Sequence, residues 1–189
     1  MTGTEVEIKA VVLHPRELAL RLRRLGTFIR PFTKVDRYFG FARELPETRF
    51  RLRRDGESWI CTRKNKILRD SIEESREEEF SVSDGELFEQ FVREAGFQLL
   101  FEKEKVGERW EVDGTTVEVS RVNDLGTYVE VELILDDDAS LPARDDARNR
   151  VRTVLDRLGV PESAVEERTY TQMIYENLSR IKTSPSRSL

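Results

Sequence analysis

Strict alternation of charged and apolar residues near the N-terminus constrains this chain more than any other feature. In Glu5-Val6-Glu7-Ile8-Lys9, two carboxylates and an ammonium group occupy every second position, with apolar residues between them. Side chains along a β-strand point alternately to its two faces. The segment therefore predicts a strand with one fully charged face and one apolar face.

A second strand of this kind comes late in the sequence. Within residues 127–133, Glu130 and Glu132 share one parity and apolar residues take the other. Carboxylate oxygens are the ligands that hard divalent cations prefer. If the two strands lie together, Glu5, Glu7, Glu130 and Glu132 can form a site for such a cation.

Strands between these two acidic segments are mostly basic on one face. Any one of them is what the solvated side of an ordinary antiparallel sheet shows. Their polar faces, however, carry few Ser, Thr, Gln or Asn and repeat Arg, Lys and Glu instead. We therefore expect the strands to curl so that the charged faces converge on a polyanion and its metal ion. The positions that share a parity are Arg49, Arg51 and Arg53; Thr62 and Lys64; Arg76 and Glu78; and Lys103, Lys105 and Arg109.

Composition narrows the class of protein. A length of 189 residues is typical of one domain, which we place at residues 1–179, and the polar residues 180–189 have nothing to bury and are predicted to be disordered. A net charge of -5 argues against a general nucleic-acid binder. No apolar run approaches the ~20 residues of a membrane span and no signal peptide is evident, so we expect a cytoplasmic protein without a membrane partner.

The scarcity of His and Cys excludes two kinds of catalytic or metal site. The chain has one His and one Cys, Cys61. Zinc sites built from His and Cys, and nucleophiles activated by His, are therefore excluded. The chemistry is left to carboxylates, arginine and lysine. Cys61 itself lies on the apolar parity of its strand and is predicted to be a core residue.

The order of predicted elements fits a barrel of the α+β class. An eight-stranded antiparallel β-barrel with a charged lumen, covered by helices on its apolar outer face, accommodates this order. Such a barrel inverts the usual arrangement, and a hydrated lumen limits the cost of burying charge. Strands are predicted at 4–12, 28–39, 48–54, 58–65, 73–82, 98–106, 108–113, 115–122 and 127–135, and helices after Pro15, after a Ser83/Glu86 capping box, near Pro142 and from Pro161 through Leu178.

Six short motifs then occur in a fixed order along the chain. They are Glu5-x-Glu7-x-Lys9, Val35-Asp36-Arg37-Tyr38-Phe39, Arg51-Leu52-Arg53, Thr62-Arg63-Lys64, Ser75-Arg76-Glu77-Glu78, and Leu125-Gly126-Thr127-Tyr128-Val129-Glu130-Val131-Glu132. In this order they resemble the CYTH, or triphosphate tunnel metalloenzyme, superfamily over nearly all of residues 4–178. The chain departs from the family pattern at Ser120, where an Asp is common. Glu118, two residues earlier on the same face, is the candidate substitute.

The resemblance implies a triphosphate-containing small molecule as partner and Mg2+ or Mn2+ as cofactor. It implies that Glu5, Glu7, Glu130 and Glu132 hold the metal, and that Lys9 and Glu78 position water or tune neighbouring charges as catalytic residues. Arginine offers planar bidentate contacts to phosphate and lysine a point charge. The residues expected to bind the phosphate chain are Arg51, Arg53, Lys64, Arg76, Lys103, Lys105 and Arg109.

Three functions remain open at this point. The favoured one is a metal-dependent hydrolase of tripolyphosphate or of an organic or nucleoside triphosphate. The second is a class IV adenylyl cyclase, which would release cyclic AMP and pyrophosphate, and the third is a non-catalytic module that binds polyphosphate or RNA 5'-ends. The short segment between Phe39 and Arg49 favours the hydrolase, because members that cyclise ATP tend to have a longer one. The chain is expected to be a monomer or a homodimer.

Overall fold

Eight antiparallel strands close into a barrel in the computed structural model of this chain, which describes residues 2–41 and 48–183. Around the barrel the strands run in the order β1-β5-β4-β3-β2-β6-β7-β8, so β8 returns to pair with β1. The barrel predicted from the sequence is confirmed. The strands are β1 (Thr2–Val11), β2 (Thr27–Gly40), β3 (Phe50–Asp55), β4 (Ser58–Arg69), β5 (Ile72–Val82), β6 (Gln98–Val112), β7 (Thr115–Val122) and β8 (Gly126–Leu135).

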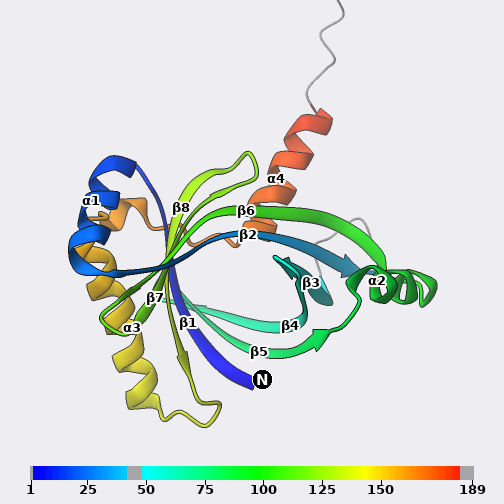
Figure 1. The fold of residues 1–189 in the computed structure, drawn as a ribbon, viewed down its shortest axis with the longest axis horizontal. Coiled ribbons are helices and arrows are strands. Elements are labelled where there is room, and N and C mark those ends of the chain that lie inside the picture. Colours follow the sequence, from blue (N-terminus) through cyan, green and yellow to red (C-terminus); the bar gives the residue numbers. More distant parts are fainter. Residues whose placement is uncertain (1, 42–47, 184–189) are drawn as a thin grey trace, which may run out of the picture.

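Helices flank this barrel, as the apolar outer faces of the strands predicted. The helices are α1 (Pro15–Leu25), α2 (Gly85–Glu94), α3 (Leu141–Arg157) and α4 (Tyr170–Thr183), with a short 3-10 helix, η1 (Glu162–Ala164). Figure 1 shows α1 and α3 together on one flank, α2 on the opposite flank and α4 rising beside β6 and β8. Within the described residues, none of the helices combines the length and apolar character needed to cross a membrane.

The largest apolar core lies outside the barrel, between its wall and two helices. Val6 and Ile8, the apolar residues of the first charged strand, are fully buried there. Leu18 and Leu22 of α1 and Val151 of α3 belong to the same cluster. Because these strands bury their apolar face outwards, their charged face is turned into the lumen.

A second core forms on the opposite flank, under α2. Cys61 is buried in it with Phe39 and Leu52, which confirms the prediction that this thiol is a core residue. The start of α2 differs from the predicted capping box. The N-cap is Asp84, whose carboxylate accepts a hydrogen bond of 3.0 Å from the Leu87 amide, rather than Ser83.

Two predicted element boundaries are wrong, for different reasons. The segments 98–106 and 108–113 form the single strand β6, which runs straight through Gly107. A Cβ at Gly107 would lie 2.1 Å from the Val119 carbonyl oxygen, so the glycine serves a close approach of β7 and not a turn. The expected final helix is divided between η1 and α4, because Val165 pairs with Ala10 at the edge of β1.

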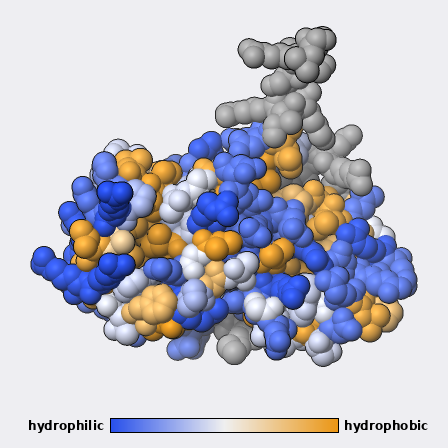
Figure 2. Space-filling view, turned by 45° about the horizontal axis from the view of Figure 1, so that its top comes forward, coloured by the Kyte–Doolittle hydropathy of each residue, from blue (hydrophilic) through white to orange (hydrophobic). Residues whose placement is uncertain are grey.

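The last helix reaches into the segment predicted to be a tail. Helix α4 continues to Thr183, beyond the predicted domain end at 179. Residues 184–189 of the predicted tail, and residues 42–47 of the short segment before Arg49, lie outside the described residues. Over the described surface, charged and polar residues dominate the face in Figure 2, and apolar residues there form separate groups.

Candidate active site

A cavity of about 220 Å³ occupies the interior of the barrel, and side chains from all eight strands line it. Most of the predicted site residues reach it, because they lie on the inward parity of their strands. Those that line the cavity are Glu5, Glu7, Lys9, Arg51, Arg53, Lys64, Lys103, Lys105, Glu130 and Glu132. The charged lining also includes Lys34, Lys66, Glu73 and Glu77, which were not predicted as part of the site, and Glu118, which the sequence suggested as a substitute metal ligand.

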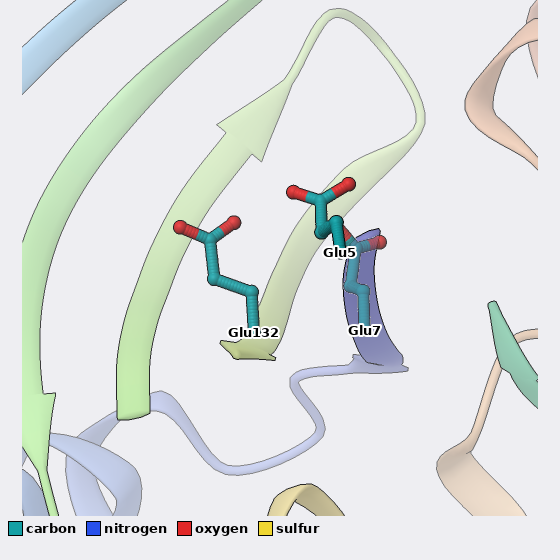
Figure 3. A group of neighbouring side chains, drawn as sticks. All are labelled: Glu5, Glu7 and Glu132. Carbon is teal, nitrogen blue, oxygen red and sulfur yellow. The ribbon is translucent and has the colours of Figure 1, made fainter. Parts of the chain in front are cut away.

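Carboxylates crowd together where β1 meets its two neighbours. The strand register places Glu7 directly opposite Glu132 of β8 on one side and Glu73 of β5 on the other. One oxygen from each of Glu5, Glu7 and Glu132 lies within 4.8 Å of the others. Figure 3 shows these three side chains projecting from their two strands toward the same region.

Burial and repulsion between carboxylates raise the pKa of two of these three groups, Glu7 and Glu132. Burial, and then the carboxylates of Glu130 and Glu5, raise the pKa of Glu7 to about 8. Burial and Glu5 likewise raise the pKa of Glu132 well above its ordinary value. Like charges directly opposite each other in a sheet are destabilising. Three converging carboxylates are a ligand set that fits a hard divalent cation such as Mg2+ or Mn2+, which would relieve the repulsion.

Glu130 occupies a different position from the other predicted metal ligands. It lines the cavity, but its carboxylate accepts a short hydrogen bond from the Lys105 ammonium group. Burial alone would lower the pKa of Lys105, but Glu130 and Glu118 outweigh it and raise that pKa. In this structure Glu130 therefore acts as the counter-ion of a lysine beside the three converging carboxylates.

The opposite side of the lumen is basic and is built around one buried aspartate. Asp36 of β2 is fully buried and accepts two hydrogen bonds from the Arg53 guanidinium, at 2.6 and 2.9 Å. The Lys103 ammonium lies 2.9 Å from the same carboxylate, and Arg51 lies 4.0 Å away. Burial would raise the pKa of Asp36, but Arg53, Lys103 and Arg51 outweigh it and hold that pKa well below its usual value.

Lys64 connects the two sides from β4. Its ammonium group contacts Glu5, and lies 2.6 Å from Glu77 and 3.3 Å from Glu73. Burial would lower the pKa of Lys64, but these carboxylates raise it well above the ordinary value. The ammonium is therefore charged and already sits at the edge of the acidic group.

Glu118 of β7 makes the corresponding connection on the basic side. Its carboxylate accepts hydrogen bonds from Lys34 at 2.5 Å, from Lys105 at 3.2 Å and from Arg109 at 2.6 Å. Burial would raise the pKa of Glu118, but Lys105 and Lys34 outweigh it and lower that pKa. The structure thus places Arg109 behind Glu118, and does not bring Glu118 to the three converging carboxylates in place of the residue missing at Ser120.

Arg76 and Glu78 do not reach the lumen, contrary to the parity expected for β5. The register pairs Ser75 with Glu5, and directly paired residues point to the same face, so the inward residues are the odd-numbered ones. The Arg76 side chain is 60% exposed and pairs with Asp137 at 3.5 Å. Glu78 faces outward as well, and its side chain is 45% exposed.

A family model described as the CYTH domain matches residues 3–170. The chain belongs to the CYTH domain family. A comparison with curated protein sequences gave no significant match. The family assignment agrees with the resemblance seen in the six motifs, all of which lie within the matched residues.

Solved structures show the same CYTH fold. A conserved hypothetical protein from Pyrococcus furiosus is 29% identical, with a TM-score of 0.75 over 89% of this chain and 98% of that one. A candidate adenylate cyclase from Vibrio parahaemolyticus is 15% identical, with a TM-score of 0.71 over 90% and 97%. The Hippeastrum protein HpAC1, described as having a dominant triphosphatase activity, is 13% identical, with a TM-score of 0.62 over 94% and 96%. The last two similarities concern the fold alone.

Lys9, the last residue of the first CYTH motif, is held by the C-terminal segment. It is 7% exposed, and its ammonium donates a hydrogen bond of 2.5 Å to the Arg168 carbonyl oxygen. Among the described residues no carboxylate lies within ion-pair distance of it. Burial lowers the pKa of Lys9, although Glu7 and Glu130 oppose the shift.

Several lumen residues were not predicted from the sequence as part of the site. Glu73 and Glu77 lie on the parity of β5 opposite to that of Arg76 and Glu78, which were expected to face the lumen. Lys34 and Asp36 share the inward parity of β2, and that shared charge was the signal that could have found both. Tyr170 reaches the cavity from the start of α4, and no periodicity connects it to the strands.

Proposed function

We propose that this protein is a divalent-metal-dependent hydrolase of triphosphate compounds, with inorganic tripolyphosphate as its simplest substrate. The observation that carries the proposal is the cavity of about 220 Å³, in which three converging carboxylates face a set of lysines and arginines. A metal ion and a polyanion are the ligands that such a lining stabilises together. The family and its HpAC1 neighbour support this assignment.

The metal would be held by Glu5, Glu7 and Glu132. When bound, Mg2+ or Mn2+ would neutralise phosphate oxygens, from which phosphoryl transfer gains much of its rate. Glu130 lies one inward position from Glu132 along β8, and its carboxylate orients Lys105. The protein thus brings a cationic donor next to the acidic group.

The phosphate chain would lie along the basic side. Asp36 fixes the Arg53 guanidinium through two hydrogen bonds and holds Lys103, so their charges are in place before an anion arrives. Preorganised donors of this kind need little reorganisation during the reaction. Lys64 and Lys105 flank the junction between the two sides, where a terminal phosphate would meet the metal.

Hydrolysis then requires a water molecule in line with the terminal phosphorus. The water oxygen forms a bond to that phosphorus, the bridging P–O bond breaks, and diphosphate leaves from tripolyphosphate. The proton that the water loses needs a nearby acceptor, and the carboxylates of the acidic group supply candidates within the cavity. Lys9, which has no carboxylate within ion-pair distance among the described residues, would hold the attacked phosphate.

Cavity size favours the hydrolase over the cyclase. Pockets that enclose drug-sized ligands measure about 300–1,000 Å³. The lumen, at about 220 Å³, is smaller and its lining is dominated by charge. Among its described lining residues, the aromatic side chains are Tyr38, Phe50 and Tyr170, and the cavity leaves little space for an adenosine group beside three phosphates.

The decisive experiment compares tripolyphosphate and ATP as substrates and identifies the products by chromatography. We expect Mg2+- or Mn2+-dependent release of phosphate, a higher kcat/KM for tripolyphosphate, and ADP with phosphate from ATP. Glu132→Gln should lower kcat at least a hundredfold, whereas the control Glu104→Gln, on the exposed outer face of β6, should retain it. Cyclic AMP with pyrophosphate would replace this proposal with the cyclase, and tight binding without any product would replace it with the binding module.

A further inference from the structure

Tyr170, at the first position of α4, occupies an unusual place in the cavity. Its side chain is 8% exposed and lines the lumen beside Thr169 and Thr171. It is contributed by the segment after the barrel, whereas the charged lining comes largely from the strands. In Figure 1 the helix rises from the barrel beside β6 and β8. Neither the family motifs nor the hydrolase proposal gives this tyrosine a task.

Three ammonium groups converge on the Tyr170 ring. The Nζ atoms of Lys9 and Lys103 lie 4.8 and 4.9 Å from the ring centroid, and that of Lys105 lies 5.6 Å away. All three distances are within the range of about 6 Å in which a cation is attracted to an aromatic ring. Asp36 is the carboxylate partner of Lys103 and Glu130 that of Lys105, and the Tyr170 ring is the contact that all three ammonium groups share.

The ring attracts these cations without neutralising them. A carboxylate brings a full negative charge, which would repel an incoming phosphate. An aromatic ring brings only its quadrupole and occupies no hydrogen-bond acceptor of the substrate. Lys9 shows the difference most clearly, since its described partners are the Tyr170 ring and the Arg168 carbonyl oxygen.

The ring itself is held in a fixed orientation. Tyr128 of β8 packs edge-on against it, with ring centroids 5.3 Å apart and an interplanar angle of 90°. The Tyr128 hydroxyl in turn donates to the Met173 sulfur at 3.5 Å. The chain before the helix is tied to β1, because the Glu166 amide donates to the Lys9 carbonyl oxygen at 2.8 Å.

We propose that Tyr170 is a positioning residue of the triphosphate site, whose ring gathers the ammonium groups of Lys9, Lys103 and Lys105 into one phosphate-binding cluster. This inference rests on the proposed function for the identity of the anion. The aromatic ring, and not the hydroxyl group, performs the task. Without the ring, Asp36 and Glu130 still hold Lys103 and Lys105, but Lys9 is no longer drawn toward them. A phosphate group that enters this end of the lumen then meets fewer ammonium groups at once.

Two substitutions at the same position separate the ring from the hydroxyl. Tyr170→Phe keeps the ring, whereas Tyr170→Leu keeps an apolar side chain but removes the ring. Calorimetric titration with tripolyphosphate, without divalent metal, should give Kd within about twofold of the parent for Phe and about tenfold or more higher for Leu, since loss of about 1.4 kcal/mol is tenfold. Ile174→Ala is the control, because this buried residue of α4 lies outside the cluster that contains Tyr128, Tyr170 and Met173.

Proton NMR of the ligand-free protein distinguishes the proposed contact between the ring and the lysines from a general loss of structure. Protons near an aromatic face shift upfield, so the lysine ε-methylene signals of Lys9 and Lys103 should be upfield in the parent and in Tyr170→Phe. They should return to ordinary positions in Tyr170→Leu. Unshifted lysine signals in the parent would overturn the proposal without any reference to ligand binding.

The Kd values for tripolyphosphate test whether the ring contributes to phosphate binding. Equal Kd values for the parent and Tyr170→Leu would overturn the proposal, as would a loss in Tyr170→Phe that matches Tyr170→Leu, or a loss in Ile174→Ala of the same size. Hydrolysis of tripolyphosphate with Mg2+ is followed in parallel. A parent protein that binds but does not hydrolyse would refute the proposed function while the comparison of Kd values still tests the ring; a parent that binds no tripolyphosphate would refute both.

Discussion

Asp36→Asn tests the idea that a single buried carboxylate holds the basic side of the lumen together. Asp36 is fully buried and is the anion that Arg53, Lys103 and Arg51 share. The amide has nearly the same shape but no charge, so three cations would be left close together without their counter-ion. We expect the free energy of unfolding to fall by about 3–5 kcal/mol, the cost of removing one partner from a buried ion pair.

This loss of unfolding free energy is large enough to measure, and Asp55→Asn is a matched control for it. For a domain of this length, about 3–5 kcal/mol lowers Tm by about 6–20 °C. Asp55→Asn also removes a carboxylate that accepts two hydrogen bonds from one arginine, Arg30. The Arg30 side chain is 41% exposed, so this substitution should cost no more than about 1 kcal/mol.

The dependence on pH and on ligand distinguishes this cause from a packing defect. The pKa of Asp36 is depressed in the folded protein, so its contribution is fully present above the unfolded-state pKa of about 3.9 and is lost as pH falls through the folded value. The difference between the parent and Asp36→Asn in urea denaturation should therefore be constant near pH 7 and shrink in acid. Tripolyphosphate should restore more stability to Asp36→Asn than to the parent. A cost equal to that of Asp55→Asn, or one independent of acid, would refute the reasoning.

Three further predictions follow from the same structure. Arg76→Ala and Glu78→Gln should each leave the kcat/KM for tripolyphosphate within about twofold of the parent, because both side chains are outside the barrel. A tenfold loss in steady-state assays would show that these residues belong to the site. Gly85→Ala should lower the free energy of unfolding in urea by about 1–3 kcal/mol, since its Cβ would lie 2.0 Å from the Trp59 ring; an unchanged midpoint would contradict this contact. Burial raises the pKa of Cys61 to about 11, so iodoacetamide at pH 8 should label it only after unfolding, and rapid labelling of the folded protein would show that the thiol is accessible.

The sequence correctly predicted which side chains face the lumen wherever one parity of a strand was apolar. In β1, Val6 and Ile8 could only be buried outwards, so the inward direction of Glu5 and Glu7 was determined by the pattern alone. The apolar residues of β8 determined the direction of Glu130 and Glu132 in the same way. Since a one-residue shift would expose the whole apolar face to the lumen, such strands have only one acceptable register.

The direction of β5 was predicted wrongly because its apolar residues lie only at its two ends. Residues 73–79 are Glu, Glu, Ser, Arg, Glu, Glu and Glu, and the apolar residues that share the outward parity of Arg76, namely Ile72, Phe80 and Val82, flank this polar run. The inward direction of Glu73 and Glu77 becomes clear from the pairing with β1, which is a property of the folded barrel. Tyr170 was missed because its position also depends on the folded barrel. It reaches the lumen as a result of how the chain returns to β1 before α4.

The order of strands around the barrel separates the charges that the sequence interleaves. Strands β8, β1 and β5 are neighbours and carry most of the lumen carboxylates, whereas β3, β2 and β6 are neighbours and carry most of its lysines and arginines. The strands between these groups carry the opposite sign: β4 extends Lys64 to the acidic side, and β7 extends Glu118 to the basic side. Together with Asp36, these residues stabilise each side of the lumen in the absence of ligand, because they place counter-ions among like charges. Closure of the barrel then sets the two sides face to face, so a ligand that is cationic at one end and anionic along its length matches the lumen in only one orientation.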